Sequence, residues 1–462
     1  MLADLADRTS TALRARGPFG SLPKGPPEPA GVQTAMWIAR PTRYLLRASH
    51  RYGDVFTMRL IATDPFVSFA HPDAIREIFT GPGDELYAGQ ANIILEPILG
   101  QHSVLLLDGA RHMRQRRLLL PPFHGQRMRA YGETIRDATI ASMDSWPRGA
   151  PFALHERTQE ITLEVIQRAV FGIDGADDLR RFGAALSSLL DTIANPLLML
   201  PVFQVDFGRY SPGGILDHRL AELDDLLFAQ IRRRRREPRD GREDILSALI
   251  DARDEAGESM SDQELRDELM TLLVAGHETT ATSIAWAFHR LLDHPEALAR
   301  AVEEVDATFG DGPIDPDRVR ELRWIDAVIK ETLRLSPVIP MVGRRLQSPM
   351  TFGATRLPAG VIAVPNIYLA HRHPDVWPDP LRFDPSRFLE QKPNPYAYFP
   401  FGGGIRRCIG MAFAMYEMAV VMAAILQRFR VEAAPGVKVR LVRRSITFSP
   451  SEGMPMVVHP RR

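Results

Sequence analysis

The single cysteine of this 462-residue chain, Cys408, stands where several features favour a reactive sulfur. It follows the glycine run 402–404 and the pair Arg406-Arg407, and a helical pattern over 411–429 begins just after it. We expect the helix N-terminus and the adjacent arginines to lower the pKa of this thiol. The glycines would let the backbone approach a flat group and turn N–H groups towards the sulfur. A thiolate held in this way is an axial metal ligand or a nucleophile, and a buried small hydrophobe is the ordinary alternative for a lone cysteine.

Spacing and composition exclude several other chemistries. The segment 402–407 lacks both G-x-G-x-x-G and the G-K-[ST] ending of phosphate-binding loops. One cysteine cannot form an internal disulfide, a four-cysteine iron–sulfur site or a C-x-x-C-H haem attachment. His277-Glu278 begins like the zinc motif H-E-x-x-H, but Ala281 stands at the second histidine position. We therefore expect no zinc site there.

A second group of chemically suggestive residues lies in the longest helical pattern. Ala275 and Gly276 come one turn before Thr279 on the same face, which leaves room for a ligand beside its hydroxyl. Glu278 is adjacent in sequence and so points about 100° away. A hydroxyl at a reacting group and a carboxylate that reaches water are suited to proton delivery. The alternative is that they are ordinary helix residues.

Most of the elements that must position these groups are predicted to be helices. The hydrophobic pattern predicts helices over 217–235, 261–294, 295–309 and 322–335. Ser261 and Glu264 have the spacing of a capping box at the start of the second. His112 and Arg116, four residues apart, would share one face of a helix opened by Asp108.

Strand signals are few and do not alternate with helices. They cover residues 55–60, 66–69, 361–365 and 437–448. Prolines recur over 374–400 and predict a long irregular segment, which the aromatic residues within it should keep packed and ordered. We predict a mainly α fold with a small β region (α+β). A proline-rich arm, residues 1–30, would precede one large catalytic domain, residues 31–462.

The overall charge and hydropathy of the chain limit the kinds of partner that can be expected. Acidic and basic side chains number 57 each, so the zero net charge gives no reason to expect nucleic acid. No stretch of about 20 residues is free of charge, as a membrane span requires. We expect a soluble cytoplasmic protein with no membrane anchor.

Four motifs carry a resemblance to a known family. Segment 401–410 resembles the haem-binding signature F-G-x-G-x-R-x-C-x-G of the cytochrome P-450 superfamily and matches it at every fixed position. Segments 275–280, 331–334 (E-x-x-R) and 383–388 look like three further family motifs, in the family's order. The resemblance spans about residues 40–450, and segment 105–125 looks most like cyanobacterial and myxobacterial members.

The resemblance implies a single fold of helices around a buried haem b and a role for each motif residue. Cys408 would be the axial ligand of the haem iron, with Phe401 packed near the sulfur side, and such ligation favours O–O cleavage. Thr279 and Glu278 would be the catalytic pair that acts on bound O2. The haem propionates would meet His112, Arg116, Arg406 and either Arg344 or Arg345, with Arg344 favoured. Glu331, Arg334 and Arg387 would form a buried structural network.

The resemblance also implies an activity, a substrate class and redox partners. The enzyme would be a monooxygenase that inserts one atom of O2 into a C–H bond of a terpenoid, steroid or fatty acid. The expected substrate contacts are mainly apolar: Ile93, Ile94, Leu198, Met199, Leu272, Ala275, Val338, Ile339, Met341 and Thr447. A ferredoxin and its NAD(P)H-dependent reductase would supply electrons to a monomer.

Three choices stay open from the sequence. Arg114, Arg117 and Arg407 would either dock an acidic electron carrier or form a solvated surface. Peroxide-driven chemistry or isomerisation could occur on the same scaffold, although Glu278 and Thr279 count against it. A haem-binding sensor or carrier without turnover is an alternative of another class.

Overall fold

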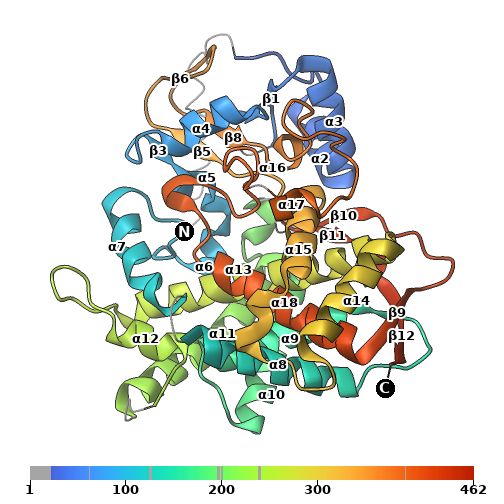
Figure 1. The fold of residues 1–462 in the computed structure, drawn as a ribbon. Helices are drawn as coiled ribbons and strands as arrows, with labels where there is room; N and C mark the ends of the chain where they lie inside the picture. Colours follow the sequence, from blue (N-terminus) through green and yellow to red (C-terminus); the bar gives the residue numbers. More distant parts are fainter. Residues whose placement is uncertain are drawn as a thin grey trace.

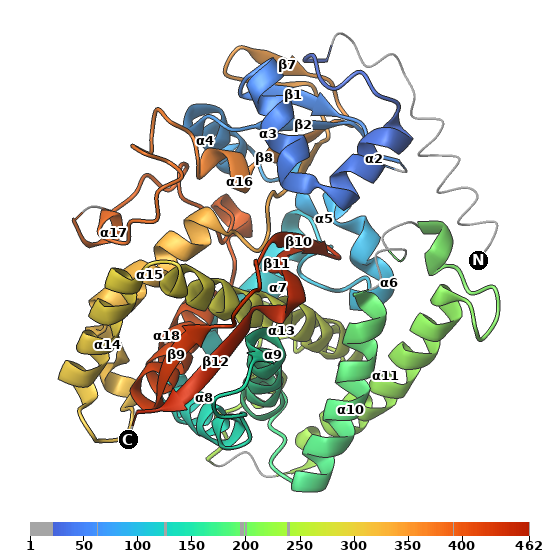
Figure 2. The same ribbon diagram turned by 90° about the vertical axis from the view of Figure 1, so that its right-hand side faces the viewer.

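The computed structural model describes residues 22–61, 63–123, 127–194, 198, 201–237, 241–390 and 392–461. A smaller lobe, rich in strands, lies against a larger helical body (Figures 1 and 2). The predicted helices and the small β region are both present, and the long helix α13 (Asp262–Leu292) runs through the helical body. Segment 22–29 packs on the smaller lobe, where the Thr57 hydroxyl donates to the Pro23 carbonyl at 2.6 Å.

Most of the helical body is built from long helices whose apolar faces meet in one large core. It comprises α8 (Arg127–Asp144), α9 (Leu154–Val165), α10 (Ala176–Ile193), α11 (Pro212–Arg236), α12 (Ile245–Asp251), α13, α14 (Pro295–Phe309), α15 (Arg323–Leu335) and α18 (Met411–Arg428). A π-helical turn, Ile166–Val170, continues α9. Of the described helices, α18 alone is long and apolar enough to cross a membrane, and here it is a buried core helix.

The boundaries of α13 follow from its end signals. The Ser261 hydroxyl accepts the Glu264 backbone N–H at 3.1 Å, and the Glu264 carboxylate accepts the Ser261 N–H at 2.8 Å. This is the predicted capping box, which satisfies two N–H groups that the first turn leaves free. The helix ends before Pro295, which begins α14. The predicted helix over 261–294 is thus confirmed.

The smaller lobe is organised around a five-stranded sheet with the order β1-β2-β8-β5-β3. Its strands are β1 (Val55–Met58), β2 (Phe66–Phe69), β3 (Leu86–Tyr87), β5 (Arg344–Leu346) and β8 (Ile362–Pro365). Strands β2 and β8 are parallel, and the other pairs are antiparallel. Around this sheet lie α2 (Ala30–Ala39), α3 (Pro41–Tyr52), α4 (Pro72–Thr80), α5 (Ala88–Ala91), α16 (Ile367–Ala370) and the hairpin of β6 (Met350–Phe352) and β7 (Thr355–Leu357). The short helix α6 (Glu96–Leu99) packs against α13 in the helical body instead.

The strand signal over 437–448 corresponds to two short strands and not to one continuous strand. The segment forms an antiparallel hairpin of β10 (Leu441–Arg444) and β11 (Thr447–Pro450). Ser445 turns the chain between them with φ of 51°, a left-handed conformation that a continuous strand cannot contain. A separate sheet pairs β4 (Phe152–Ala153), β12 (Pro455–Pro460) and β9 (Phe429–Ala433) in that order.

The proline-rich segment 374–400 is irregular, as predicted, apart from the single turn α17 (Arg387–Glu390). Its aromatic rings pack on one another: Phe388 lies 4.9 Å from Tyr398 and 6.0 Å from Trp377, between ring centroids. The Tyr398 hydroxyl donates to the Lys330 carbonyl at 3.0 Å, which ties the segment to α15 in the helical body.

Candidate active site

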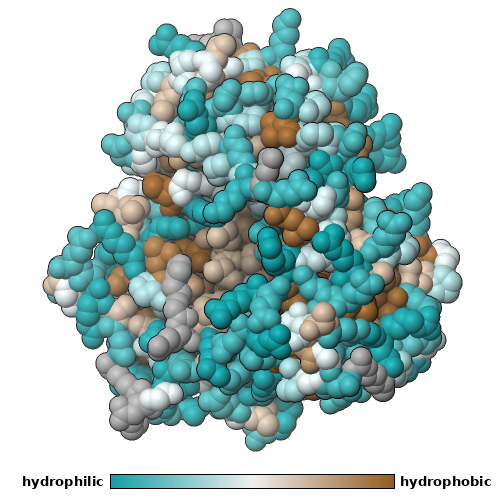
Figure 3. All heavy atoms as spheres, viewed as in Figure 1, coloured by the Kyte–Doolittle hydropathy of each residue, from teal (hydrophilic) through white to brown (hydrophobic). Residues whose placement is uncertain are grey.

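A cavity of about 2330 Å³ lies between the smaller lobe and the helical body. Figure 3 shows hydrophobic residues gathered at this waist on an otherwise largely hydrophilic face. The cavity is bordered by α13, by the turn that carries Cys408, by loop 90–105, by segment 338–344 and by the β10–β11 turn. Each of these five regions carries residues for which chemistry or substrate contacts were predicted.

Cys408 lies on the cavity wall, between the short 3-10 turn Gly404–Arg406 and α18. Its backbone N–H donates to the Phe401 carbonyl at 2.9 Å, which closes the turn. Phe401 lines the same cavity. The side chain is accessible from the cavity and otherwise surrounded by protein.

The direction of the pKa shift at Cys408 differs from our expectation. Burial raises the pKa of the thiol, although the Gly410 and Met411 amides and the Arg116 and Arg407 charges oppose it. The predicted groups are therefore present, but desolvation outweighs them because the sulfur lies deep in the molecule.

Two glycines of the turn lie so close to Phe79 that neither position has room for a side chain. A Cβ on Gly403 would lie 2.3 Å from the Phe79 ring, and one on Gly404 would lie 2.2 Å from the Phe79 carbonyl oxygen. Gly402 and Gly404 also have positive φ, 68° and 64°. Phe79 of α4 therefore fixes the turn from the side of the smaller lobe.

The predicted basic residues come together at the cavity wall. His112 and Arg116 lie on α7 (Gly109–Leu119), Arg344 lies on β5 and Arg406 on the turn before Cys408. Burial and the neighbouring arginines lower the pKa of His112 to about 3, so its ring is neutral near pH 7. Its buried Nδ1 has no hydrogen-bond partner in the part of the chain that the structure describes.

The charges of these arginines are compensated to different degrees. Arg406 pairs with Asp108 and donates to the Val104 carbonyl at 3.0 Å. Arg344 is 6% exposed, donates to the Gly343 and Gly403 carbonyl oxygens and lies over the Phe79 ring, and burial lowers its pKa to about 10. Among the described residues neither Arg344 nor Arg116 has a carboxylate within 4 Å. Two cations thus face the cavity without a direct ion pair to a described carboxylate.

Asp108 and Arg345 each make contacts that the sequence did not indicate. Asp108 stands at the N-cap of α7, but its side chain does not cap that helix and instead accepts the Gly89 and Gln90 N–H groups and pairs with Arg406. Arg345 does not itself line the cavity and pairs with Asp64 at 2.8 Å. The choice between Arg344 and Arg345 was a matter of which neighbour faces inward, and Arg344 does.

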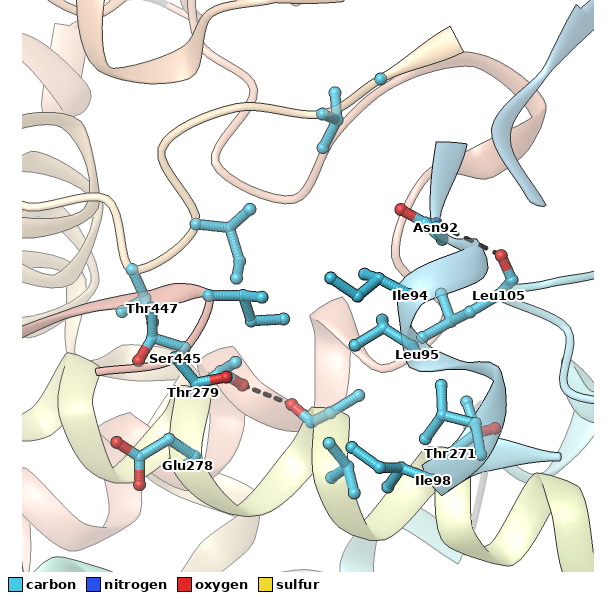
Figure 4. A pocket seen from close by; sticks show the side chains of 18 of the residues that line it. Asn92, Ile94, Leu95, Ile98, Leu105, Thr271, Glu278, Thr279, Ser445 and Thr447 are labelled. Atoms are coloured by element: carbon cyan, nitrogen blue, oxygen red, sulfur yellow. Dashed lines mark hydrogen bonds between the residues drawn. The ribbon is translucent and has the colours of Figure 1, made fainter. Parts of the chain in front are cut away.

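On α13, Ala275, Gly276, Glu278 and Thr279 all border the cavity. The Thr279 hydroxyl donates to the Ala275 carbonyl at 2.6 Å. The Glu278 carboxylate faces α9, where it accepts the Gln159 amide at 2.7 Å, and burial raises its pKa. Figure 4 shows the two side chains pointing in different directions.

Glu331, Arg334 and Arg387 lie together beneath the proline-rich segment. Arg334 and Glu331 are fully buried and form a two-bonded ion pair at 2.6 and 2.7 Å. Arg334 also donates to backbone carbonyls of that segment, whereas Arg387 lies 3.6 Å from Glu331. The arrangement joins α15 to segment 379–387.

The predicted substrate contacts divide into three groups. Those that line the cavity are Ile93, Ile94, Leu272, Ala275, Val338, Ile339, Met341 and Thr447. Leu198 does not, because its side chain is buried in the main core, which corrects that prediction. Met199 lies outside the described residues.

Two of the three arginines that were considered either as a docking site for an electron carrier or as solvated surface are paired with acids. Arg114 pairs with Asp254 at 2.6 Å and Glu264 at 2.8 Å, and Arg117 pairs with Glu255. Arg407 stays exposed and contacts the Met411 sulfur. Sequence could not show this, because the acids lie about 140 positions away in the chain.

The sequence also resembles proteins of one family over nearly its whole length. It matches the profile described as Cytochrome P450 over residues 23–455. The Mycobacterium tuberculosis protein named cytochrome P450 135B1 is 40% identical over 410 residues, which cover 88% of this chain and 85% of that protein. Cytochrome P450 138 of the same organism is 38% identical over 448 residues, 96% and 98% of the two chains. The chain belongs to the cytochrome P450 family.

Solved cytochrome P450 structures agree with the fold. The retinoic acid-bound cyanobacterial CYP120A1 has a TM-score of 0.84 at 24% identity and covers 95% of this chain and 100% of its own. CYP102L1 has a TM-score of 0.81 at 26% identity, with 91% and 98% covered. The expected fold of helices and small sheets around a central site is confirmed.

Cytochromes P450 are haem-thiolate monooxygenases in which an axial cysteine binds the haem iron. The residues of this cytochrome P450 fit such a group. Cys408 is the chain's only cysteine and borders the cavity, and Arg116 and Arg344, which form no direct ion pair with a described carboxylate, offer two cations for two propionates. The unpartnered His112 Nδ1 lies in the same wall.

Several residues of the site were not predicted. Asp108 as the partner of Arg406, Phe79 beneath the glycine turn, and Gln159 and His155 beside Glu278 come from distant segments. None belongs to a motif with a recognisable spacing, so only the packing of α9 and the smaller lobe reveals them.

Proposed function

We propose that this cytochrome P450 hydroxylates an apolar small molecule of the terpenoid, steroid or fatty acid class with electrons from a ferredoxin and its reductase. The observation that carries this proposal is the large cavity, whose walls combine Cys408 with mostly apolar side chains. Such a lining favours ligands with few polar anchors. Residues 31–462 would form one catalytic domain, with residues 1–30 as its arm.

Each wall of the cavity has a proposed task. Cys408 would bind haem b, which supplies oxygen activation when bound. Phe401 would pack beside the sulfur, and His112, Arg116, Arg344 and Arg406 would hold the propionates. The ion pair of Arg406 with Asp108 leaves Arg116 and Arg344 as the main counter-charges.

The proposed catalytic residues are Thr279 and Glu278. The Thr279 hydroxyl, fixed by the Ala275 carbonyl, would hold a proton at the oxygen site. Glu278 would renew that proton from water on the α9 side. The network of Glu331, Arg334 and Arg387 would hold the segment that precedes Cys408 and take no part in the reaction. Ile93, Ile94, Leu272, Ala275, Val338, Ile339, Met341 and Thr447 would contact the substrate.

The absorption spectrum of the reduced, carbon-monoxide-bound protein tests the ligand assignment. A thiolate ligand gives a strongly red-shifted Soret band, which should be lost in Cys408→Ala. Its survival in that variant would refute the assignment. Spectral titration with a steroid, a sesquiterpene and dodecanoic acid tests the substrate class, because a ligand that displaces iron-bound water changes the spin state.

Peroxide release tests the role of Thr279. With a plant-type ferredoxin, its reductase and whichever of the three compounds changes the spin state, Thr279→Ala should release more hydrogen peroxide per product than the unmodified enzyme. Unchanged coupling would contradict the assignment. A spin-state change without any product would favour a sensor or carrier.

A further inference from the structure

The Glu278 carboxylate is held by groups that no sequence motif indicated. Its Oε2 accepts the Gln159 side-chain N–H at 2.7 Å, and its Oε1 accepts the Thr282 hydroxyl at 3.2 Å. Gln159 belongs to α9, and Thr282 lies one turn further along α13. The Thr279 hydroxyl is engaged elsewhere, with the Ala275 carbonyl (Figure 4). The carboxylate is therefore tied on the side away from the oxygen site.

The hydrogen bonds continue beyond Thr282 to a charged residue. His155 Nε2 lies 3.0 Å from the Thr282 hydroxyl and 3.6 Å from Glu278 Oε1. His155 Nδ1 lies 3.4 Å from the Arg444 guanidinium, on the β10 strand. One hydrogen-bond chain thus joins Arg444, His155, Thr282 and Glu278.

The donor and acceptor capacities of these groups fix the direction in which the hydrogen bonds of this chain are donated. A guanidinium can only donate, so His155 Nδ1 must accept and its proton must sit on Nε2. Nε2 then donates to the Thr282 oxygen, which leaves the Thr282 hydroxyl proton for Glu278. All donors therefore point towards the carboxylate, as they do at Gln159. Such an arrangement favours the ionised form of Glu278.

The other ionisable groups nearby leave the direction of these hydrogen bonds unchanged. Burial lowers the pKa of His155 to about 3 and that of His277 to about 4, so both rings are neutral near pH 7. His277 Nε2 contacts the Gln159 carbonyl, and Glu156 lines the same cavity. Burial raises the pKa of Glu278, and Gln159, Arg444 and Thr282 oppose this effect.

We propose that Gln159, Thr282 and His155 are positioning residues for Glu278. They hold its carboxylate against α9, where it takes a proton from water, until it leaves them to deliver that proton towards Thr279. Arg444 sets the polarity of this chain. The proposal rests on the proposed function of Glu278. It assigns the resting position of the acid to residues outside the motif that contains it.

Infrared difference spectroscopy of the haem-loaded protein tests the hold on Glu278 directly. The carboxyl C=O band that Glu278→Gln removes reports its protonation as pH is varied. Thr282→Val keeps the shape of the side chain but removes one hydrogen bond to a charged group, so the titration midpoint should rise by about one pH unit. Arg444→Met should raise it by less, and Thr282→Ser should restore it.

Two matched variants control for the loss of a hydroxyl or an arginine. Thr139→Val removes a buried hydroxyl on α8, and Arg440→Met removes an exposed arginine before β10. Neither residue contacts Glu278, so both should leave the midpoint unchanged. Midpoints in Thr282→Val and Arg444→Met that equal those of the controls would overturn the proposed hold.

A second measurement tests whether release from the hold limits proton delivery. The reduced holoprotein is mixed with oxygen-saturated buffer in H2O and in D2O, and its return to the oxidised spectrum is timed. Thr282→Val should return severalfold faster than Thr139→Val, with a smaller pH dependence. A rate equal to the control, despite a shifted infrared midpoint, would overturn the delivery step. If Thr279→Ala leaves coupling unchanged, the proposed function fails while the infrared result stands.

Discussion

At the scale of single residues, a buried carboxyl on the helix after Cys408 affects stability. Glu417 of α18 is 3% exposed, and its Oε1 has no hydrogen-bond partner among the described residues. Burial alone raises its pKa to about 8. Between the unfolded value of 4.5 and about 8, the folded state keeps a proton that the unfolded state releases. The stabilisation that proton binding at Glu417 gives the folded state is therefore complete below pH 4.5 and is lost as pH rises through about 8.

Glu417→Gln replaces this carboxyl with a neutral group of similar shape. Relative to the variant, the unmodified protein should lose about 1.4 kcal/mol of unfolding free energy per pH unit over this window. Urea unfolding of both holoproteins at pH 5, 6, 7 and 8 measures the difference. Glu303→Gln, an exposed change on α14, should show no such slope. Parallel pH profiles for Glu417→Gln and the unmodified protein would contradict the prediction.

At the scale of elements, the turn that carries Cys408 depends on its contact with α4. Gly404 has a φ of 64°, and a Cβ there would lie 2.2 Å from the Phe79 carbonyl oxygen. Gly436 has a similar φ, 75°, but nothing lies within 4 Å of its Cβ position. A comparison of substitutions at Gly404 and Gly436 therefore separates the effect of backbone strain from that of a steric clash.

Gly436→Ala should cost about 1–2 kcal/mol, the cost of a left-handed conformation for a residue with a Cβ. Gly404→Ala should cost more, because the turn must also move away from Phe79. It should lower the haem content as well, since the turn carries Cys408. Urea unfolding and the haem-to-protein ratio measure both effects. Equal losses in the two variants would show that the contact with Phe79 has no effect.

The buried ion pair of α15 acts at the same scale. Arg334 joins Glu331 to the backbone of segment 380–382, and its guanidinium lies 5.0 Å from the Trp377 ring. Arg334→Leu leaves the Glu331 charge buried and should cost about 3–5 kcal/mol in urea unfolding. Arg323→Leu, an exposed change on the same helix, should cost less than about 0.5 kcal/mol. Similar losses in both would contradict a structural role for the pair.

At the scale of the whole molecule, loop 100–107 connects the cavity wall to both α13 and the Cys408 turn. Asp267 of α13 accepts the His102 backbone N–H at 3.0 Å and pairs with its ring, and Glu268 accepts the Val104 N–H at 2.9 Å. Arg406 binds the Val104 and Leu107 carbonyls from the other side. The loop can therefore move only if these contacts break.

Asp267→Ala should release this loop without affecting the Cys408 turn. Hydrogen–deuterium exchange of residues 100–107 should become faster, because the amide of His102 loses its acceptor. Asp262→Ala, at the start of the same helix and paired with Arg235, is the control and should leave this exchange unchanged. Unaltered exchange in Asp267→Ala would show that other contacts hold the loop.

The sequence by itself determined what depends on neighbours along the chain. The bounds of α13 follow from Ser261, Glu264 and Pro295, and the position of Cys408 at a helix start follows from local glycines. The break at Ser445 was missed, because strand periodicity does not show a residue with positive φ. Arg344 was already favoured over Arg345, and the structure then placed it on the cavity wall.

Only the tertiary structure decided what depends on burial and on distant partners. The pKa of Cys408 is raised because packing removes water, an effect that local charges could not reveal. Arg406 pairs with Asp108, Arg114 pairs with Asp254, and Glu278 accepts a hydrogen bond from Gln159. Each partner lies more than a hundred residues away in the sequence. The motif residues are local in sequence, but the groups that orient and charge them come from elements that meet only in the folded chain.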